Sequence, residues 1–523
     1  MNTDATTRPA SRALRELTAG LLSVPADIEV SDVTLDSRSV SAGALFLACR
    51  GGSHHGLKFA RQAAERGARA VLYEQESLES TGPAPALGSG IFVAPVPRLG
   101  AQAGLIADRF FGCVSEALTV AGITGTNGKT TCAWLLAQAL AACKRPAAYM
   151  GTLGYGMPPV LTATQHTTSD AVTVHRHLAA LRELGAECVS MEVSSHAIDQ
   201  HRVAAVRFET AAFTNLTRDH LDYHGTMQAY GAAKARLFGW PSLAHRVINI
   251  DDPFGAQLAA QPSAARLVTT TRRGSQSAVP PGAQGETGFV CATRVAHEAA
   301  GLRIGIESSW GGGALTVPLI GDFNADNVLT VLAILLSWDV PLAQALAALG
   351  RCTAPSGRME LFGGTRGAPL AIVDFAHTPD GLDKALRAAR IHCQGSLRLV
   401  FGCGGDRDRG KRPVMGRIAA QLADEIIVTD DNPRTEDPAR IVGDILTGIR
   451  ESGARPAGSR LTRAPLVEHD RALAIRSTLQ RSAGTDAVLI AGKGHEDYQI
   501  YGTTRRPFSD QAVVRSFMEE AKV

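Results

Sequence analysis

The chain lacks the features that would mark a secreted, membrane-bound or nucleic-acid-binding protein. Its 53 basic and 50 acidic residues leave a formal net charge of +3 over 523 residues, too little to attract a polyanion or a lipid surface at long range. The N-terminus contains no apolar signal core, and the longest strongly apolar run, Val328 to Trp338, is too short to cross a bilayer. We therefore expect a cytoplasmic protein with no nucleic-acid partner and no membrane insertion.

The nine cysteines form no pattern that would stabilise the fold by cross-links or metal. They are odd in number and scattered, and no Cys-x-x-Cys pair occurs. Neither a disulfide framework nor a zinc site is therefore favoured, and reduced thiols in a cytosol fit best. No internal repeat of short period is visible.

What the chain does contain is the composition of packed globular domains, with 45% hydrophobic and 20% charged residues. At roughly one domain per 150 residues, its length suggests about three. The first hundred residues carry TLDSRSV, ALFLACRGGSHHG and ARAVLY, a small α/β pattern that ends in a Gly/Pro-rich segment, Thr81 to Pro97.

The middle of the chain alternates predicted strands and helices. A strand is expected over Leu118 to Ile123, with a helix from Thr130 after a glycine-rich turn. Val174, Leu178 and Leu181 recur at helical spacing, and the run Cys188 to Val193 then reads as a buried strand. Repeated βα units predict a parallel, doubly wound sheet. The segment Arg272 to Gly288 is rich in Gly, Ser and Pro, and we expect an exposed loop there.

The segment Thr124 to Thr131, TGTNGKTT, follows a predicted strand and opens a helix, which is the context of a P-loop. Its glycines let backbone N–H groups approach phosphates, and the helix N-terminus adds partial positive charge. Lys129 can reach the β- and γ-phosphate oxygens, and Thr130 can hold Mg²⁺. Because Ile123 replaces the first glycine of the usual pattern, an ordinary Gly-rich turn is the competing interpretation. The Gly-Lys-Thr-Thr core favours a nucleotide triphosphate site.

After about Gly350, four apolar strands each run into a polar or glycine-rich segment. The four stretches are AIVDFAHTPD, LRLVFGCGGDRDRGKRP, EIIVTDDNPR and AVLIAGKGHEDY. Ligands bind at the carboxyl ends of strands in open α/β sheets, so these segments predict a second wall of an active site.

These patterns together predict an α/β fold of three domains. The first is a small N-terminal α/β domain over 1–108. The second is a central domain over 109–349, with a P-loop-type, mostly parallel sheet. The third is a Rossmann-like C-terminal domain over 350–523.

Eight segments of the chain together resemble the Mur ligase family in order and spacing. They are GTNGKTT, MEVSSHAIDQHR, TNLTRDHLDYHG, YGAAKARLF, GRME, DFAHTPD, DNPR and GKGHEDY. The resemblance extends over essentially the whole chain. In that family ATP phosphorylates a substrate carboxylate, and an amine then attacks the acyl phosphate. The resemblance therefore implies an amide-forming ligase of peptidoglycan precursor synthesis that uses ATP and Mg²⁺.

The resemblance also implies which residues bind the nucleotide. They are Gly125, Thr126, Asn127, Gly128, Lys129, Thr130 and Thr131 of the P-loop, with Asn327, Arg358 and Asp374 at the adenine and ribose. Either asparagine of GDFNADN could instead cap the helix that follows.

By the same resemblance, Lys129, Lys234 and His220 are the catalytic residues, and the metal ligands are Thr130, Glu192, His220 and Lys234. Mg²⁺ prefers oxygen ligands, so Glu192 is a stronger candidate than His220. The family carries a carbamylated lysine where this chain has Lys234. Alone, Lys234 would be interpreted as an exposed helical lysine.

The UDP-muramoyl dipeptide would be bound by the first two domains. The residues that match the family are Leu35, Ser37, Gly52, Ser53 and His54 at the uridine nucleotide, and His166, Thr167, Thr168, Ser194, Gln200 and Arg202 at the muramoyl dipeptide. Arg202 can clamp a carboxylate with two hydrogen bonds. His166 departs from the family, which usually has Asn there, although a ring nitrogen can still donate a hydrogen bond.

The DNPR segment matches the family's motif for meso-diaminopimelate, which differs from lysine by a second, distal carboxylate. A guanidinium at Arg434 would pair with that carboxylate, and Glu496 with the distal ammonium. The matching contacts are Arg407, Asp431, Asn432, Pro433, Arg434, Gly492 and Glu496. The expected reaction adds meso-diaminopimelate to a UDP-muramoyl dipeptide.

Three alternatives stay open beside this interpretation. A lysine-adding counterpart and folylpolyglutamate synthetase share the chemistry, but DNPR argues against both. A nonenzymatic nucleotide switch needs only the P-loop and would not need the second wall after Gly350.

Overall fold

The computed structural model describes residues 11–25, 28–52, 54–75, 86–88, 90–164, 166–278, 287–298, 301–364, 367–451 and 464–520. The chain divides into two compact units. One unit comprises Met1–Thr124, Lys144–Ala212 and Ala233–Arg246, and the other comprises Gly125–Cys143, Phe213–Ala232 and Val247–Val523. Helices and mostly parallel sheets alternate through the described residues, so the fold is α/β as expected.

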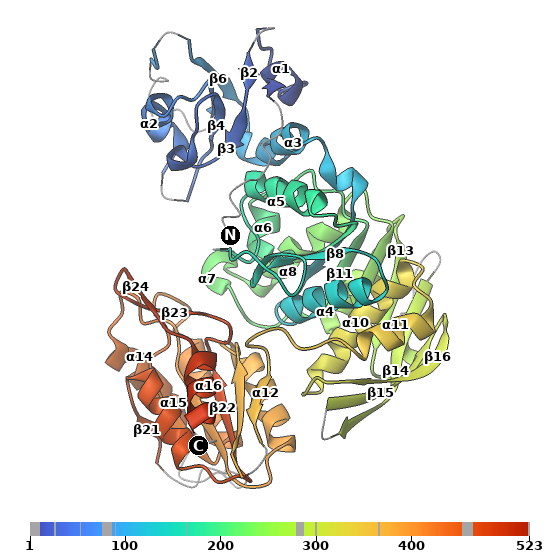
Figure 1. Cartoon of the computed structure of the whole chain (residues 1–523), viewed down its shortest axis with the longest axis vertical. Helices are drawn as coiled ribbons and strands as arrows, with labels where there is room; N and C mark the ends of the chain where they lie inside the picture. Colours follow the sequence, from blue (N-terminus) through green and yellow to red (C-terminus); the bar gives the residue numbers. More distant parts are fainter. Residues whose placement is uncertain are drawn as a thin grey trace. The chain divides into compact units, whose positions relative to one another are not determined.

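The N-terminal segment, blue in Figure 1, contains a parallel sheet in the order β3-β4-β5-β6. The strands are β3 (Asp32–Thr34), β4 (Ala44–Ala48), β5 (Ala70–Glu74) and β6 (Phe92–Val96), and a short antiparallel pair precedes them, β1 (Arg12–Ala13) with β2 (Glu29–Val30). The helices are α1 (Leu14–Leu17), α2 (Ala60–Glu65) and α3 (Leu99–Phe111), with 3₁₀ turns at η1 (Ser37–Ser39) and η2 (Gly56–Phe59). Every residue of β4 is buried, as expected for one of the two inner strands of this small sheet.

The largest sheet has ten strands in the order β16-β15-β14-β13-β12-β11-β7-β10-β8-β9. Their bounds are β7 (Thr119–Thr124), β8 (Ala147–Gly151), β9 (Gly154–Gly156), β10 (Cys188–Glu192), β11 (Thr210–Phe213), β12 (His245–Asn249), β13 (Arg266–Thr271), β14 (Thr287–Glu298), β15 (Gly301–Ser308) and β16 (Gly311–Val317). β10 pairs in parallel with β7 and β8, whereas β14, β15 and β16 form an antiparallel meander. The sheet is therefore mixed, with antiparallel pairs at its ends.

Helices and 3₁₀ turns connect the strands of this sheet. They are α4 (Lys129–Ala142), α5 (Ala171–Glu183), α6 (Ser195–Asp199), α7 (Leu221–His224), α8 (Met227–Ala235), α9 (Pro253–Ala259), α10 (Phe323–Ser337) and α11 (Leu342–Leu349), with 3₁₀ turns at η4 (Val114–Ala117), η5 (Arg236–Gly239) and η6 (Ser275–Ser277). α10 contains most of the apolar run noted in the sequence and is buried almost throughout. Among the described residues, no helix is both long and apolar enough to span a membrane.

The C-terminal segment, orange to red in Figure 1, has a six-stranded sheet in the order β17-β18-β22-β19-β20-β21. The strands are β17 (Glu360–Gly363), β18 (Leu370–Asp374), β19 (Leu397–Phe401), β20 (Glu425–Val428), β21 (Leu466–Val467) and β22 (Ala487–Ala491), followed by the hairpin β23 (Tyr498–Tyr501) and β24 (Thr504–Pro507). The helices are α12 (Pro379–Ile391), α13 (Lys411–Leu422), α14 (Pro438–Glu451), α15 (Arg471–Gln480) and α16 (Asp510–Glu520). Only β17 is antiparallel to its neighbour, so the carboxyl ends of the other strands share one edge.

The expected elements are present with small differences at their ends. β7, α4, α5 and β10 lie where the sequence predicts them, and β18, β19, β20 and β22 are the four strands expected after Gly350. The predicted loop Arg272 to Gly288 is only partly described: η6 lies within it, residues 279–286 lie outside the described residues, and Thr287 and Gly288 already belong to β14.

Candidate active site

The loop between β7 and α4 has the backbone shape of a phosphate cradle. Gly125 has φ +150° and Gly128 has φ +88°, which side-chain-bearing residues rarely adopt. A Cβ at Gly125 would overlap Thr214 Oγ1, and a Cβ at Gly128 would overlap Asn327 Oδ1. The two glycines are therefore needed for both conformation and space, and the first turn of α4 starts directly after the second.

The same loop is held by hydrogen bonds to the segment Thr214 to Thr217 (TNLT), which follows β11. Thr126 N donates to Asn215 O (2.8 Å), and Asn127 N donates to Asn215 Oδ1 (3.0 Å). Lys129 Nζ donates to the carbonyl oxygens of Gly125 (2.9 Å) and Thr126 (2.8 Å), so its ammonium lies over the loop. The amide groups of Thr126 and Asn127 are thus engaged within the protein, and the start of α4 and Lys129 provide the positive charge for a triphosphate. The cradle fits the phosphates of a nucleotide.

The structure brings the adenine and ribose candidates close to this loop. Arg358 Nη2 lies 3.3 Å from Thr130 Oγ1, and its guanidinium stacks over Phe375 at 4.2 Å from the ring centroid. Asp374 accepts hydrogen bonds from Met359 N (3.2 Å) and Ala376 N (3.1 Å). Burial raises the pKa of Asp374 to about 6, although Arg358 opposes the shift.

Asn327 also lies beside the phosphate cradle, and it does not cap a helix. α10 begins at Phe323, so Asn324 and Asn327 both stand inside its first turns. Asn327 Nδ2 donates to Asn324 Oδ1 (2.8 Å), and Asn324 Nδ2 donates to Ile320 O (2.8 Å). The capping alternative is therefore wrong for both residues.

Glu192, at the carboxyl end of β10, is a buried carboxylate held by several donors. Its Oε1 accepts hydrogen bonds from Tyr149 Oη (2.5 Å) and Thr152 N (2.9 Å), and its Oε2 accepts one from Thr152 Oγ1 (3.2 Å). His220 adopts the left-handed conformation (φ 53°), and its side chain is 44% exposed.

These donors fit a magnesium ion better than a softer metal. Within the described ranges no group of three or more His, Cys, Asp or Glu side chains is placed to hold a metal ion. Mg²⁺ is usually bound by one or two carboxylates and completes its shell with water and phosphate oxygens. The buried carboxylate of Glu192 matches that chemistry, and an all-protein cage is not required.

Lys234, in α8, is not exposed: only 1% of its surface is accessible. The general expectation of a solvated helical lysine is therefore wrong for this residue. Burial disfavours the charged ammonium, so a buried lysine needs a special environment or a chemical modification.

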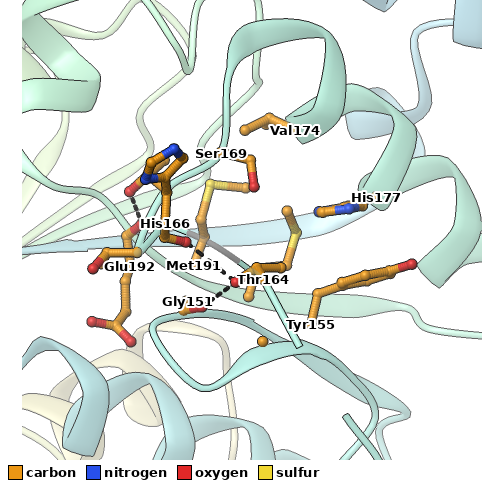
Figure 2. Close-up of a pocket in the computed structure, with 13 residues that line it drawn as sticks. Gly151, Tyr155, Thr164, His166, Ser169, Val174, His177, Met191 and Glu192 are labelled. Atoms are coloured by element: carbon orange, nitrogen blue, oxygen red, sulfur yellow. Dashed lines mark hydrogen bonds between the residues drawn. The ribbon is translucent and has the colours of Figure 1, made fainter. Parts of the chain in front are cut away.

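A pocket lies between β8, β9, β10 and the start of α5. Thirteen residues line it: Met150, Gly151, Gly154, Tyr155, Thr164, His166, Thr167, Thr168, Ser169, Val174, His177, Met191 and Glu192. Figure 2 shows His166 and Glu192 on one side of the pocket and Tyr155 and His177 on the other. Three of the residues expected at the muramoyl dipeptide, His166, Thr167 and Thr168, thus line one cavity with Glu192.

The remaining dipeptide candidates form a network around the same segment. Arg202 Nη1 donates to Thr168 O (3.0 Å), and its Nε and Nη2 donate to Gln200 Oε1 at 3.0 and 2.6 Å. Thr168 Oγ1 donates to Glu192 O (2.8 Å), and Ser194 Oγ accepts from Ala197 N (3.2 Å) at the start of α6. The hydroxyls of Thr168 and Ser194 therefore make hydrogen bonds within the fold, whereas the guanidinium of Arg202 is partly exposed to solvent.

The expected uridine contacts lie at the ends of β3 and β4. Ser37 is buried and its hydroxyl donates to Gln62 Oε1 (2.7 Å), whereas Leu35 is half-buried. Gly52 and His54 are exposed, and Gly51 N donates to His54 O (2.9 Å) in a tight turn. Ser53 lies outside the described residues.

Arg407 and Arg434, predicted to bind the added amino acid, follow the carboxyl ends of the neighbouring strands β19 and β20. Arg434 has φ 53°, and its Nη1 donates to Gly405 O (2.8 Å). Burial and the neighbouring charge of Arg407 both lower the pKa of Arg434. Two guanidinium groups whose charges act on each other favour an anionic ligand.

Asp431, Asn432, Gly492 and Glu496 form the adjoining part of this site. Asn432 Nδ2 donates to Glu496 Oε2 (2.8 Å), and Asn432 Oδ1 accepts from Ile500 N (3.0 Å). Gly492 has φ +119°, and a Cβ there would come within 2.8 Å of Asp431 Oδ2. Pro433 is buried in the turn that carries Arg434. All seven residues predicted for this end of the site thus follow the carboxyl ends of the neighbouring strands β19, β20 and β22.

Two features of these sites were missed by the sequence. The rings of Tyr155 and His177 stack at 3.7 Å between centroids and 10° between planes, and burial lowers the pKa of His177 to about 4. Lys493 is fully buried beside Glu496. No motif singles out Tyr155 or His177, but Lys493 stands inside GKGHEDY and could have been found there.

Three family profiles match the chain, in the order of its parts. "Mur ligase family, catalytic domain" matches residues 29–97, "Mur ligase middle domain" matches residues 123–335, and "Mur ligase, glutamate ligase domain" matches residues 357–494.

Curated relatives cover nearly the whole chain. A UDP-N-acetylmuramoyl-L-alanyl-D-glutamate--2,6-diaminopimelate ligase of Ectopseudomonas mendocina (strain ymp) is 45% identical over 481 residues, which are 92% of this chain and 93% of the relative. The protein of the same name from Pseudomonas aeruginosa is 44% identical over 484 residues, 92% of this chain and 94% of the relative.

Solved structures agree with this similarity. A structure of a UDP-N-acetylmuramoyl-L-alanyl-D-glutamate--2,6-diaminopimelate ligase has a TM-score of 0.67 and 33% identity, and covers 98% of this chain and 100% of its own. MurF from Acinetobacter baumannii has a TM-score of 0.65 at 17% identity, covering 97% of this chain and 99% of its own, and shares the fold.

Proposed function

This chain belongs to the Mur ligase family, and on that premise we infer that it is the ATP-dependent ligase that adds meso-2,6-diaminopimelate to UDP-N-acetylmuramoyl-L-alanyl-D-glutamate. Its products are the amide, ADP and phosphate, and its place is cytoplasmic peptidoglycan synthesis. The observation that carries the specificity is the pair Arg407 and Arg434 beside Glu496, because together they match a distal group with one carboxylate and one ammonium.

Amide formation from a carboxylate needs a leaving group, which ATP supplies. A carboxylate oxygen of the dipeptide attacks the γ-phosphorus and ADP leaves. The neutral amine then attacks the acyl carbon, phosphate leaves, and the amine nitrogen loses its proton. We propose that Lys129 and the start of α4 stabilise the negative charge of the transferred phosphoryl group.

We propose that Mg²⁺ binds through Thr130 and Glu192, with His220 and a carbamylated Lys234 as further ligands. When bound, it would neutralise charge on the phosphates. Arg202 would orient a substrate carboxylate, and His166, Thr167, Thr168, Ser194 and Gln200 would line the dipeptide. Leu35, Ser37, Gly52, Ser53 and His54 would contact the uridine nucleotide, and Asn327, Arg358 and Asp374 the adenosine.

We propose that three domains, 1–108, 109–349 and 350–523, bind the UDP-substrate, ATP and the amino acid respectively. The separate sheets β3–β6 and β17–β22, and the separate family profiles, support this division. The boundary at 108 falls within α3, so the helix would extend the first domain by a few residues.

A phosphate-release assay tests the proposal. Purified protein with ATP, Mg²⁺ and UDP-muramoyl dipeptide receives meso-diaminopimelate, L-lysine, L-glutamate or no amino acid in parallel. We expect rapid release only with meso-diaminopimelate. Preference for lysine or glutamate would favour the lysine-adding or folylpolyglutamate alternative, and release without any amino acid would favour a nucleotide switch.

A further inference from the structure

Lys493 is a fully buried cation beside the residues proposed to bind the added amino acid. Its Nζ lies 2.7 Å from Glu496 Oε2, 3.3 Å from Asn432 Oδ1 and 3.7 Å from Asp431 Oδ1. The ring of Tyr498 lies 5.3 Å from the same nitrogen. One lysine therefore contacts three of the proposed ligand-binding residues.

These contacts leave Glu496 with one oxygen for a ligand. In the part of the chain that the structure describes, the two side-chain donors to its carboxylate, Lys493 Nζ and Asn432 Nδ2, both contact Oε2. Oε1 remains as the acceptor for a bound ammonium. The Glu496 side chain is 17% exposed, whereas Lys493 is not exposed, so a ligand can reach the carboxylate but not the lysine.

The charge of Lys493 is also needed because two carboxylates lie close to each other here. Asp431 and Glu496 are both within 4 Å of its ammonium, so Lys493 places one positive charge against both carboxylates. The neighbouring Arg471 also acts on both carboxylates through its charge, but its Nε and Nη2 donate hydrogen bonds to Asp510, at 2.7 and 2.8 Å.

We propose that Lys493 is a positioning residue that fixes the Glu496 carboxylate through Oε2, with Oε1 directed to the distal ammonium of the added amino acid. Lys493 acts through Glu496 and does not touch the substrate. The inference rests on the proposed function, since it names what selects the distal ammonium of that same substrate.

The test compares two amino-acid substrates. L-2-Aminopimelate keeps the reacting amine and the distal carboxylate of meso-diaminopimelate but lacks the distal ammonium. We expect Lys493→Met to raise the KM for meso-diaminopimelate about ten- to a hundredfold, the effect of losing a charged hydrogen bond. The KM for L-2-aminopimelate should stay within about twofold, and Glu496→Gln should give the same pattern.

Controls separate positioning from folding. Lys144→Met removes an exposed lysine and should change neither KM. A double variant, Lys493→Met with Glu496→Gln, should be no worse than either single variant if the two residues act together. If Lys493→Met does not fold, Lys493→Gln is used in its place, and failure of both to fold overturns the proposal because the lysine is then a folding residue.

The outcomes are distinct. An equal rise of both KM values, or no change in either, overturns the positioning role. A wild-type enzyme that does not use meso-diaminopimelate rejects the proposed function before any variant is compared. The proposal is supported if KM rises for meso-diaminopimelate alone and if the effects of the two substitutions on that KM do not add in the double variant.

Discussion

Lys234 lies in α8 with 1% of its surface accessible, and a buried ammonium is costly to desolvate. A carbamate formed from the neutral amine and CO₂ would carry oxygen donors suited to Mg²⁺. We expect native mass spectrometry to find the added mass of one CO₂ at Lys234, lost after acid treatment.

Replacement of this lysine tests its part in the reaction. Lys234→Ala should lower kcat by on the order of a hundredfold or more, since charge stabilisation at the phosphoryl group is lost. Lys58→Ala, at an exposed lysine, is the control and should keep full phosphate release. A bare lysine in the native protein, together with an active alanine variant, would reject the assignment.

Arg434 is the residue on which the choice of amino acid depends. Removing one partner of a buried charged pair costs about 3–5 kcal/mol, so Arg434→Ala should raise the KM for meso-diaminopimelate about a hundredfold or more. The KM for L-lysine should be high in the wild type and should change little in the variant, because lysine has no distal carboxylate. Steady-state kinetics with both substrates measure the effect.

Arg434→Lys is the matched control for charge. It keeps the positive charge but loses the two-pronged geometry, so it should recover only part of the affinity. If Arg434→Ala leaves the KM for meso-diaminopimelate unchanged, the assignment of substrate specificity to Arg434 is wrong. Only the proposed ligase chemistry would then remain.

At the scale of elements, two aspartates cap helices with the same geometry but different surroundings. Asp170 Oδ1 accepts from Val172 N (3.0 Å) and Thr173 N (3.1 Å) at the start of α5. Asp252 caps α9 in the same way, and its second oxygen also accepts from Leu216 N (2.8 Å), within the segment that clamps the P-loop. The second cap therefore connects a helix to the nucleotide site.

Alanine variants of the two capping aspartates can be compared for stability and for ATP use. Asp170→Ala should lower the free energy of unfolding by about 1 kcal/mol, the usual cost of a lost cap. Asp252→Ala should cost more and should also raise the KM for ATP, which Asp170→Ala leaves unchanged. Urea unfolding and ATP kinetics measure both. Equal effects of the two variants on ATP use would contradict the connection to the P-loop.

At the scale of the whole molecule, a buried ion pair makes stability depend on pH. Arg412 donates to Glu436 and, with the backbone N–H of Asp406, holds the pKa of Glu436 at about 2, below its usual 4.5. Because the folded state favours the ionised form, this stabilisation is fully present above about pH 4.5. It is lost as the pH falls toward about 2.

Glu436→Gln should therefore reduce the free energy of unfolding most at neutral pH. The difference from wild type should shrink as the pH falls below about 4.5, where wild-type Glu436 begins to lose its advantage. Urea unfolding of the full chain from about pH 7 to about pH 3 measures this. A difference that stays constant over that range would show that Glu436 does not titrate in the way its contacts require.

The sequence by itself determined the parts of this protein whose chemistry is local. GTNGKTT contains the turn and the start of α4 directly after β7, and the backbone geometry at Gly125 and Gly128 follows from residue type. The strands β18, β19, β20 and β22 are short apolar runs between polar segments, so their positions and the edge where they end were predictable. The capping role considered for the asparagines was not, because the start of α10 depends on residues around it.

Only the tertiary structure decided which side chains are buried and which distant segments meet. Lys234 and Lys493 look like ordinary lysines in a sequence, because helical spacing does not tell which face another segment covers. The stack of Tyr155 on His177, and the pairing of Arg412 with Glu436, join residues that no short motif connects. Such contacts arise when the hydrophobic faces of separate elements pack together, and that packing sets both the charge state and the direction of the polar groups within it.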